Sequence, residues 1–175
     1  MPARRVTAAV FLVAIGPCLV VSAQSTAARS HAVSATDRAG IEELLAAYNQ
    51  ALSSCASAQY AGLFTADGTF TSDDFRGATH RRLYGKAATL SGHAKLVELV
   101  ETEEFCLNPQ QRAARAAAAR QNAGSFPDLT LEVTAQGIRG VLPLGNGGRY
   151  EDVYEKTPDG WKFKSRRVMM PAAPR

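Results

Sequence analysis

The segment at residues 148–170, GRYEDVYEKTPDGWKFKSRRVMM, limits the possible folds more than any other part of the chain. Apolar and polar residues alternate on both sides of a Pro158-Asp159-Gly160 turn, which is the pattern of a β-hairpin. One face of this hairpin carries aromatic rings, a carboxylate and a guanidinium side by side. Such a face can form the floor of a small-molecule pocket, so the segment predicts both a sheet and a place for a ligand.

The register of the hairpin decides which of its side chains meet. We expect Lys156 to pair with Trp161 across the turn. Because side chains alternate between faces, one face then carries Tyr150, Asp152, Tyr154, Phe163, Ser165 and Arg167. Asp152 and Arg167 would be diagonal neighbours, either an acid–base group held by an arginine or a buried ion pair that fixes the register. A register shifted by one residue would exchange the two faces.

The first residues have the composition of a secretory signal peptide. Arg4 and Arg5 precede an apolar run at residues 6–21, and a small-residue cleavage site ends at Ala23. The run is shorter than the roughly 20 residues that a membrane-spanning helix needs, and a Gly-Pro pair interrupts it. We therefore expect residues 1–23 to be removed and the protein to be periplasmic or secreted, with an uncleaved anchor as the alternative.

Removal of that segment changes the charge and the cysteine content. It leaves 18 of the 20 Lys and Arg residues beside 16 Asp and Glu residues, a net charge of +2. So small a charge gives no basis for binding nucleic acid, and we expect no membrane contact after cleavage. Cys55 and Cys106 remain, and a pair in an exported chain favours a disulfide, with two free thiols as the alternative. The sequence has no CxxC motif and no Cys/His cluster, so we expect neither a metal site nor a cofactor.

Two helices are predicted early in the chain, after a small and polar leader at residues 24–35 that we expect to be disordered. Thr36 or Asp37 can cap the first helix. Its apolar stripe would consist of Ile41, Leu44, Leu45, Tyr48 and Leu52. Ser57 can cap a short second helix, whose inward-facing residues would be Tyr60, Leu63 and Phe64.

The middle of the chain gives weaker signals. Residues 73–92 include ATHRRLY between two glycines, which suits a strand or a loop, with His80 exposed. Ser91 can cap a third helix that would end near Glu101. The apolar face of that helix would be Leu96, Val97, Leu99 and Val100. Residues 107–124 are rich in Ala, Arg and Gln without a large apolar residue after Leu107, so we expect an exposed insertion.

The remainder of the chain reads as strands. Leu129, Leu131 and Val133 alternate with polar residues, and a second alternating run at 138–144 precedes the hairpin. Helices first and hairpin-linked strands afterwards favour an α+β fold, with a curved antiparallel sheet wrapped around three N-terminal helices. The sequence thus predicts one domain at residues 36–170, followed by a tail at 171–175.

Several short motifs occur together in this predicted domain. They are Tyr48 on the first helix, YAGLFTADGTF at 60–70, Gly92 before the third helix, YEDVY at 150–154, DGWKF at 159–163 and Arg167. In these motifs the chain resembles the SnoaL-like branch of the nuclear transport factor 2-like (NTF2-like) superfamily over residues 36–170, except the insertion at 107–124. The resemblance implies a cone-shaped domain with a cavity at its wide end, and a homodimer. Such proteins include polyketide cyclases, dehydratases, isomerases and non-catalytic subunits.

One departure from this resemblance bears on catalysis. Dehydratase members typically have an aspartate five residues after the first-helix tyrosine, where this chain has Ser53, and a second three residues later, where it has Ala56. They also use histidine pairs, which His80 and His93 do not clearly match. A serine cannot serve as the carboxylate in acid–base catalysis, so dehydration by that mechanism is not expected.

Two functions are therefore carried forward. The first is an exported, non-catalytic binding or interaction protein that holds a small apolar or polycyclic ligand or dimerises through its sheet. Its ligand-binding residues would be Tyr48, Tyr150, Asp152, Tyr154, Phe163 and Arg167. The alternative is a lyase or isomerase of the polyketide cyclase/dehydratase type, with Asp152 as the base and Tyr48 or His80 as the donor. A cavity toward which Asp152 and Tyr48 both point would favour the alternative.

Overall fold

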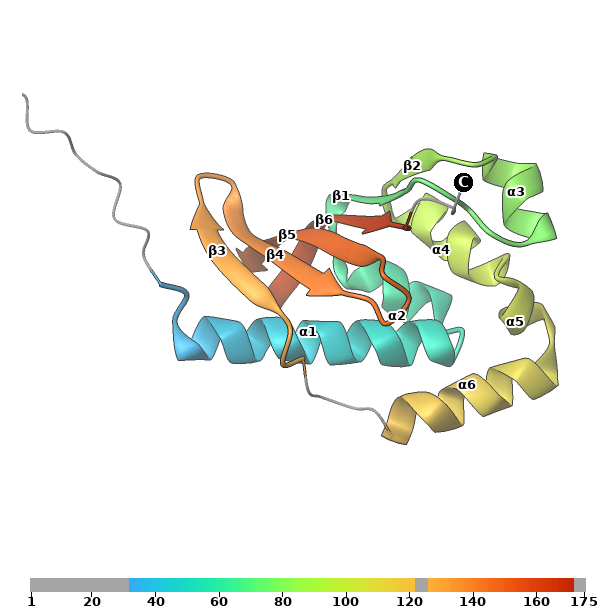
Figure 1. Cartoon of the computed structure of the whole chain (residues 1–175), viewed down its shortest axis with the longest axis horizontal. Helices are drawn as coiled ribbons and strands as arrows, with labels where there is room; N and C mark the ends of the chain where they lie inside the picture. Colours follow the sequence, from blue (N-terminus) through green and yellow to red (C-terminus); the bar gives the residue numbers. More distant parts are fainter. Residues whose placement is uncertain (1–31, 122–125, 172–175) are drawn as a thin grey trace, which may run out of the picture.

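A computed structural model describes residues 32–121 and 126–171 of the chain (Figure 1). The expected signal peptide at 1–23 and most of the expected leader lie outside these residues. The helices are α1 (Ala35–Ser53), α2 (Ser57–Gly62), α3 (Ala78–Tyr84), α4 (His93–Glu101), α5 (Glu104–Leu107) and α6 (Pro109–Gln121). The strands are β1 (Phe64–Ser72), β2 (Ala88–Ser91), β3 (Thr130–Thr134), β4 (Gly137–Pro143), β5 (Arg149–Thr157) and β6 (Gly160–Met169).

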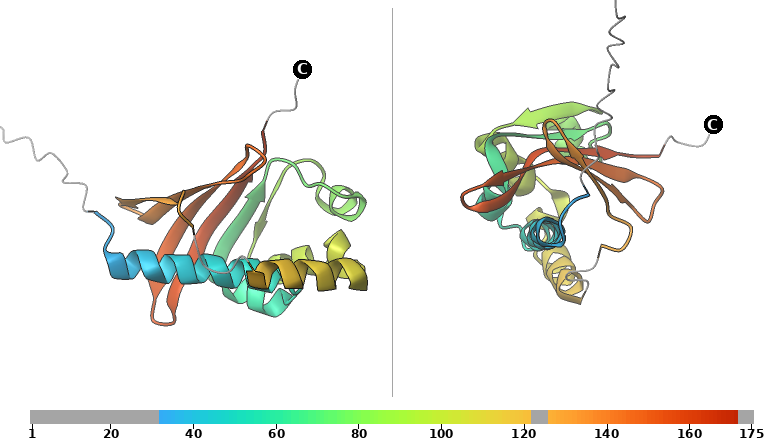
Figure 2. Two further views of the ribbon diagram at one scale, coloured as in Figure 1. Left: turned by 60° about the horizontal axis from the view of Figure 1, so that its bottom comes forward. Right: turned by 90° about the vertical axis from the view of Figure 1, so that its left-hand side faces the viewer.

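The strands form one six-stranded sheet in the order β2-β1-β6-β5-β4-β3. Neighbouring strands are antiparallel except for β1 and β6, which run parallel. The sheet curves over α1, which lies across one of its faces (Figure 2). The α+β class with a curved sheet on helices is thus confirmed, with the β1–β6 pair as an exception to the expected antiparallel pairing.

Helix α1 supplies one side of the core, as its apolar spacing predicts. Its stripe residues Ile41, Leu44, Leu45 and Tyr48 are all buried, because they recur on the side that faces the sheet. The cap differs from the expectation. The helix begins one residue earlier than Thr36, and the backbone N–H of Asp37 donates to Oγ of Ser34 at 3.0 Å.

The segment at 73–92 contains a helix that the sequence did not predict, because ATHRRLY forms α3. Ser91 does not cap the next helix, since it belongs to β2 and pairs with Thr69 of β1 in extended conformation. Gly92 precedes α4 instead, with a φ of 79° that suits glycine and without a side-chain cap. The expected end of this helix near Glu101 is confirmed.

The described part of the insertion at 107–124 folds mainly as α6, which follows the short α5 and packs beside α1 (Figure 1). Its described side chains are exposed almost throughout, as expected, although the segment is helical. Cys106 of α5 forms a disulfide with Cys55 after α1, which confirms the expected pairing. Within the described part of the chain, no helix combines the length and the apolar character needed to cross a membrane.

Candidate functional site

The hairpin of β5 and β6 pairs as expected near its turn and differs further away. Lys156 lies opposite Trp161 and Tyr154 opposite Phe163. A β-bulge follows, in which Lys164 is the extra residue on β6. Because an extra residue shifts the alternation by one position, the faces of β6 beyond the bulge are exchanged relative to the simple hairpin.

The expected pairing of Asp152 with Arg167 is therefore wrong. Asp152 lies opposite Arg166, the residue that precedes Arg167, and Arg166 is 1% exposed. Arg167 is exposed on the other face and donates from Nη2 to both carboxylate oxygens of Asp73, at 3.0 and 3.2 Å. Ser165 lies opposite Val153 and is only half-buried.

Arg166 lies in the centre of an aromatic cluster. Its guanidinium carbon is 3.9 Å from the ring centroid of Tyr48, 3.7 Å from that of Tyr150 and 4.7 Å from that of Phe163. Its Nε is 3.5 Å from Oδ1 of Asp152. The cation is thus held by ring faces and by one carboxylate, which together replace the water that burial removes.

Asp152 serves this cluster rather than an open space. The Tyr154 hydroxyl donates to Oδ2 of Asp152 at 2.8 Å. Burial raises the pKa of Asp152, while the charge of Arg166 and the Tyr154 hydrogen bond lower it. Burial opposes the charge on Arg166, but Asp152 and the neighbouring tyrosines raise the pKa of the guanidinium, which stays protonated. The carboxylate therefore has two fixed partners inside the protein.

A cavity of about 340 Å³, partly open to solvent, has the rings of Tyr48 and Tyr150 in its wall, and these are the rings that stack on Arg166. Its lining comes from all six helices, from β1, β5 and β6 and from adjoining loops: Tyr48, Leu52, Tyr60, Phe70, Ser72, Asp74, Phe75, Arg76, His80, Leu99, Glu103, Phe105, Arg115, Tyr150, Val168 and Met170. Six of these residues are Tyr or Phe, and five are Asp, Glu, Arg or His. A volume of this size fits a small organic molecule.

The cavity brings together only some of the residues expected from the sequence. Tyr48, Tyr150 and His80 line it. Asp152, Tyr154 and Phe163 do not line it, since they pack in the cluster around Arg166. Ser53, at the position of the dehydratase aspartate, does not line it either.

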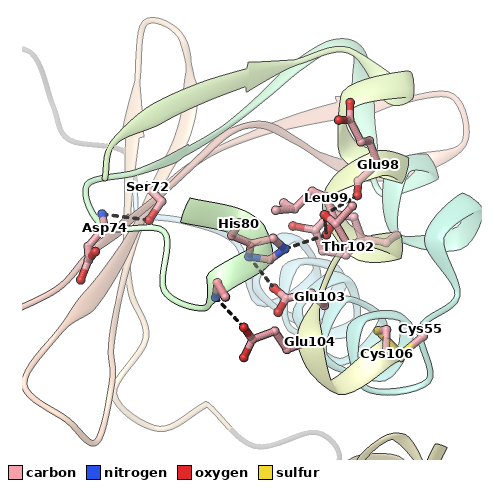
Figure 3. Close-up of polar contacts among 12 residues, drawn as sticks. Cys55, Ser72, Asp74, His80, Glu98, Leu99, Thr102, Glu103, Glu104 and Cys106 are labelled. Atoms are coloured by element: carbon pink, nitrogen blue, oxygen red, sulfur yellow. Dashed lines mark hydrogen bonds and ion pairs between the residues drawn. A yellow bond between two sulfur atoms is a disulfide. The ribbon is translucent and has the colours of Figure 1, made fainter. Parts of the chain in front are cut away.

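His80 is buried, which corrects the expectation of an exposed loop residue. Helix α3 turns its ring inward, where Nε2 donates to the carbonyl oxygen of Leu99 at 3.2 Å. That hydrogen bond leaves Nδ1 directed to Oε1 of Glu103, 3.9 Å away (Figure 3). Burial raises the pKa of Glu103, and the charges of His80 and Arg115 lower it.

Two tyrosine hydroxyls meet in the cavity wall. The hydroxyl of Tyr60 donates to that of Tyr48 at 3.4 Å, and both side chains are buried. Burial is the main cause that raises the pKa of each phenol, so both remain neutral hydrogen-bond donors. The Tyr48 hydroxyl can thus donate to an acceptor on a ligand.

Several lining residues were not singled out from the sequence. Phe70 and Ser72 are two apart on β1, so period-two alternation could have placed them on one face. Phe75, Glu103 and Arg115 carry no such signal, because they come from a loop, a helix junction and the insertion. Only the packing of these segments brings them to one cavity.

Comparisons with known proteins agree with this architecture. The family model described as "SnoaL-like domain" matches residues 33–167. An NTF2-like protein with a cystatin-like fold from Novosphingobium aromaticivorans is similar in structure, with a TM-score of 0.50 and 18% identity over 79% of this chain and 84% of that one. ActVI-ORFA from Streptomyces coelicolor is also similar, with a TM-score of 0.51 and 16% identity over 79% of this chain and 97% of that one. No curated protein matches the chain. The two structural likenesses bear on the fold alone.

Proposed function

Since the chain belongs to the SnoaL-like domain family, we propose that it is a non-catalytic binding protein whose cavity holds one small, mainly apolar ligand. The cavity itself carries this proposal, because it offers about 340 Å³ behind a wall rich in aromatic rings. Rings of Tyr48, Tyr60 and Tyr150 suit the flat faces of an aromatic or polycyclic ligand. The Tyr48 hydroxyl would orient the ligand by donating to an oxygen.

The two carboxylate positions expected to act in catalysis are missing from the cavity wall, and its carboxyl and imidazole groups are those of Asp74, His80 and Glu103 instead. General acid–base catalysis requires a titrating group within hydrogen-bond reach of the substrate. The dehydratase aspartate is replaced by Ser53, and Asp152 is held by Tyr154 and Arg166. The polar groups that remain at the cavity can orient a ligand.

The alternative function is a lyase or isomerase of the polyketide cyclase/dehydratase type. Its expected proton donors line the cavity, but its expected base, Asp152, does not. Tyr48 and His80 both line the cavity, which favours this alternative. Asp152 does not line it, and the rings of Tyr48 and Tyr150 stack on its partner Arg166. A reaction that needs Asp152 at the substrate would require these rings to move.

A neutral fluorescent probe tests the binding proposal. N-phenyl-1-naphthylamine becomes fluorescent in apolar surroundings, and we expect one molecule to bind per chain. Val168→Trp would fill the cavity, which Val168 lines, and should abolish binding. Val133→Trp is the matched control, because Val133 is a 40% exposed strand residue outside the lining.

The outcomes of this experiment are distinct once circular dichroism has established that both variants are folded. Loss of binding in Val168→Trp with retention in Val133→Trp supports the cavity as the site. Equal binding in the two variants, or no binding by the unchanged protein, contradicts the proposal.

We also propose that the protein is exported to the periplasm or secreted, and that it forms a homodimer. The charged and apolar pattern of residues 1–23 and the Cys55–Cys106 disulfide support export. Native mass spectrometry of the protein from the periplasm or medium would test both points. We expect a mature mass without residues 1–23, two chains per particle, and any retained ligand as added mass. A mass that still includes residues 1–23 contradicts export, and a monomer contradicts the dimer.

A further inference from the structure

Five acidic or basic side chains line the cavity, and four of them lie near a partner of the opposite type. Two acidic groups, Asp74 and Glu103, line the cavity together with the basic residues Arg76, His80 and Arg115. Nε of Arg76 donates to Oδ2 of Asp74 at 3.1 Å. Nδ1 of His80 lies 3.9 Å from Oε1 of Glu103. Each acid thus has a basic partner nearby, and Arg115 is the third base.

Arg115 makes no ion pair or hydrogen bond with any side chain that the structure describes. Its guanidinium carbon instead lies 4.1 Å from the ring centroid of Phe105, over the ring face. Both residues line the cavity. Stacking holds the planar group in place and leaves its N–H donors at the edge free for another acceptor.

Glu103 could compete for Arg115, because the other acidic lining residue, Asp74, accepts a hydrogen bond from Arg76. The distance of Glu103 from Arg115 exceeds the 4.0 Å of an ion pair, whereas His80 is closer. Burial raises the pKa of Glu103, which disfavours a lone negative charge in this wall. Arg115 thus acts on Glu103 through its charge without an ion pair or hydrogen bond, and the N–H donors of its guanidinium remain available to a ligand.

We infer that Arg115 binds the acidic group of the ligand, so the cavity takes an organic acid with an aromatic or polycyclic body. The body would pack on the tyrosine wall, and the carboxylate would accept hydrogen bonds from the guanidinium at the mouth. This inference rests on the proposed binding function and adds the chemical class of the ligand. The insertion that forms α6 then acts as a specificity element, because it supplies the cation.

Two dyes with one skeleton test this inference. The anionic dye 8-anilinonaphthalene-1-sulfonate carries a sulfonate that the neutral N-phenyl-1-naphthylamine lacks, and the sulfonate stands in for the carboxylate. We expect the unchanged protein to bind the anionic dye more tightly. Arg115→Gln should lower the affinity for the anionic dye about three- to tenfold and leave the affinity for the neutral dye unchanged.

Arg112→Gln is the matched control, since Arg112 is an exposed arginine on the same helix outside the cavity lining. This control should leave the affinity for both dyes unchanged. A general effect of net charge would instead lower the affinity for the anionic dye equally in Arg112→Gln and Arg115→Gln. Arg115→Lys keeps the charge without the planar stacking group and should give an intermediate affinity.

The results separate this inference from the function on which it rests. If both dyes bind with equal affinity and Arg115→Gln affects neither selectively, the acid-binding inference is wrong and the binding proposal stands. Equal weakening of the anionic dye by Arg112→Gln and Arg115→Gln also overturns the inference. If neither dye binds, the binding proposal and the inference both fail.

Discussion

The buried arginine Arg166 joins the sheet to the first helix through its contacts with aromatic rings. It stacks on Tyr48 of α1 and on Tyr150 of β5, and its charge is opposed by Asp152. Oδ1 of Asp152 and the Nε and Nη1 atoms of Arg166 make no hydrogen bond with the described residues. The cluster thus depends on charge and ring stacking, and either charge left alone would be costly.

Removal of one charge from this pair should destabilise the fold strongly. Asp152→Asn leaves Arg166 buried without a counter-charge and should lower the free energy of unfolding by about 3 kcal/mol. Arg166→Met should cost a similar amount, because it leaves Asp152 alone and removes the stacked cation. The double variant should lose clearly less free energy of unfolding than the sum of the two single losses, and urea denaturation would measure all three. Additive losses would contradict a coupled pair.

Arg167→Met provides the control for that series. Arg167 is adjacent in sequence, carries the same charge and forms an exposed ion pair with Asp73. Surface substitutions of this kind change the free energy of unfolding by roughly 0.5 kcal/mol or less. A loss as large as that of Arg166→Met would contradict the assignment of Arg166, rather than Arg167, to the core.

At the scale of elements, α1 and the β5–β6 hairpin meet at a position that requires glycine. A Cβ added to Gly40 would lie 2.6 Å from Cδ1 and 3.1 Å from Nε1 of the Trp161 ring. Trp161 is the second residue of β6 and is partly buried against the core. The missing side chain at Gly40 thus sets how closely the helix and the hairpin approach.

Gly40→Ala should therefore destabilise the protein although alanine favours helices. Better helix propensity contributes about 1 kcal/mol, and overpacking against the indole costs about 1–3 kcal/mol, so a net loss of about 1 kcal/mol is expected. Gly62→Ala is the matched control on α2, where a Cβ would meet nothing within 4 Å. It should be neutral or stabilising by up to about 1 kcal/mol. Thermal unfolding would compare the two, and a stabilised Gly40→Ala variant would contradict the close packing.

At the scale of the whole molecule, the disulfide connects the end of α1 to α5, and both helices contribute residues to the cavity wall. Cys55 follows α1, and Cys106 lies in α5 next to Phe105, which lines the cavity. The bond closes a loop with a sequence separation of 51 residues. In the chain-entropy account, a loop of this length stabilises the fold mainly by restricting the unfolded chain.

Loss of the disulfide should lower the free energy of unfolding by about 4 kcal/mol. The paired variant Cys55→Ser/Cys106→Ser, measured by urea denaturation, gives this difference without a reductant. Dithiothreitol should shift the unfolding midpoint of the unchanged protein and leave that of the variant unchanged. An unchanged midpoint for the reduced protein would show that the bond contributes little.

Local patterns were sufficient for much of the fold. The apolar stripe from Ile41 to Tyr48 identifies α1, because period 3.6 depends only on nearby residues. Alternation around Pro158-Asp159-Gly160 identifies the hairpin and its pairing near the turn for the same reason. Helix α3 escaped prediction because His80 is its only buried residue, so no apolar stripe marks it.

The candidate site was predictable only in part. Tyr48 and Tyr150 follow from the helix stripe and the strand alternation, and both line the cavity. The simple hairpin register places Arg167 on the face of Asp152, and only the bulge at Lys164 puts Arg166 there instead. That bulge depends on how β6 pairs with its neighbours, which no local sequence signal records.

Local sequence is enough to identify the class of fold, the main helix, the hairpin and the cysteine pair, since each rests on composition or on a period within a few residues. The role of the hairpin face depends on long-range packing instead. One extra residue in β6 turns Arg166 inward and Arg167 outward, and Asp152 then pairs with Arg166 in the aromatic cluster and does not line the cavity. Side-chain direction alternates at every residue along a strand, so a single bulge reverses a whole face while it leaves the hydrophobic pattern nearly unchanged.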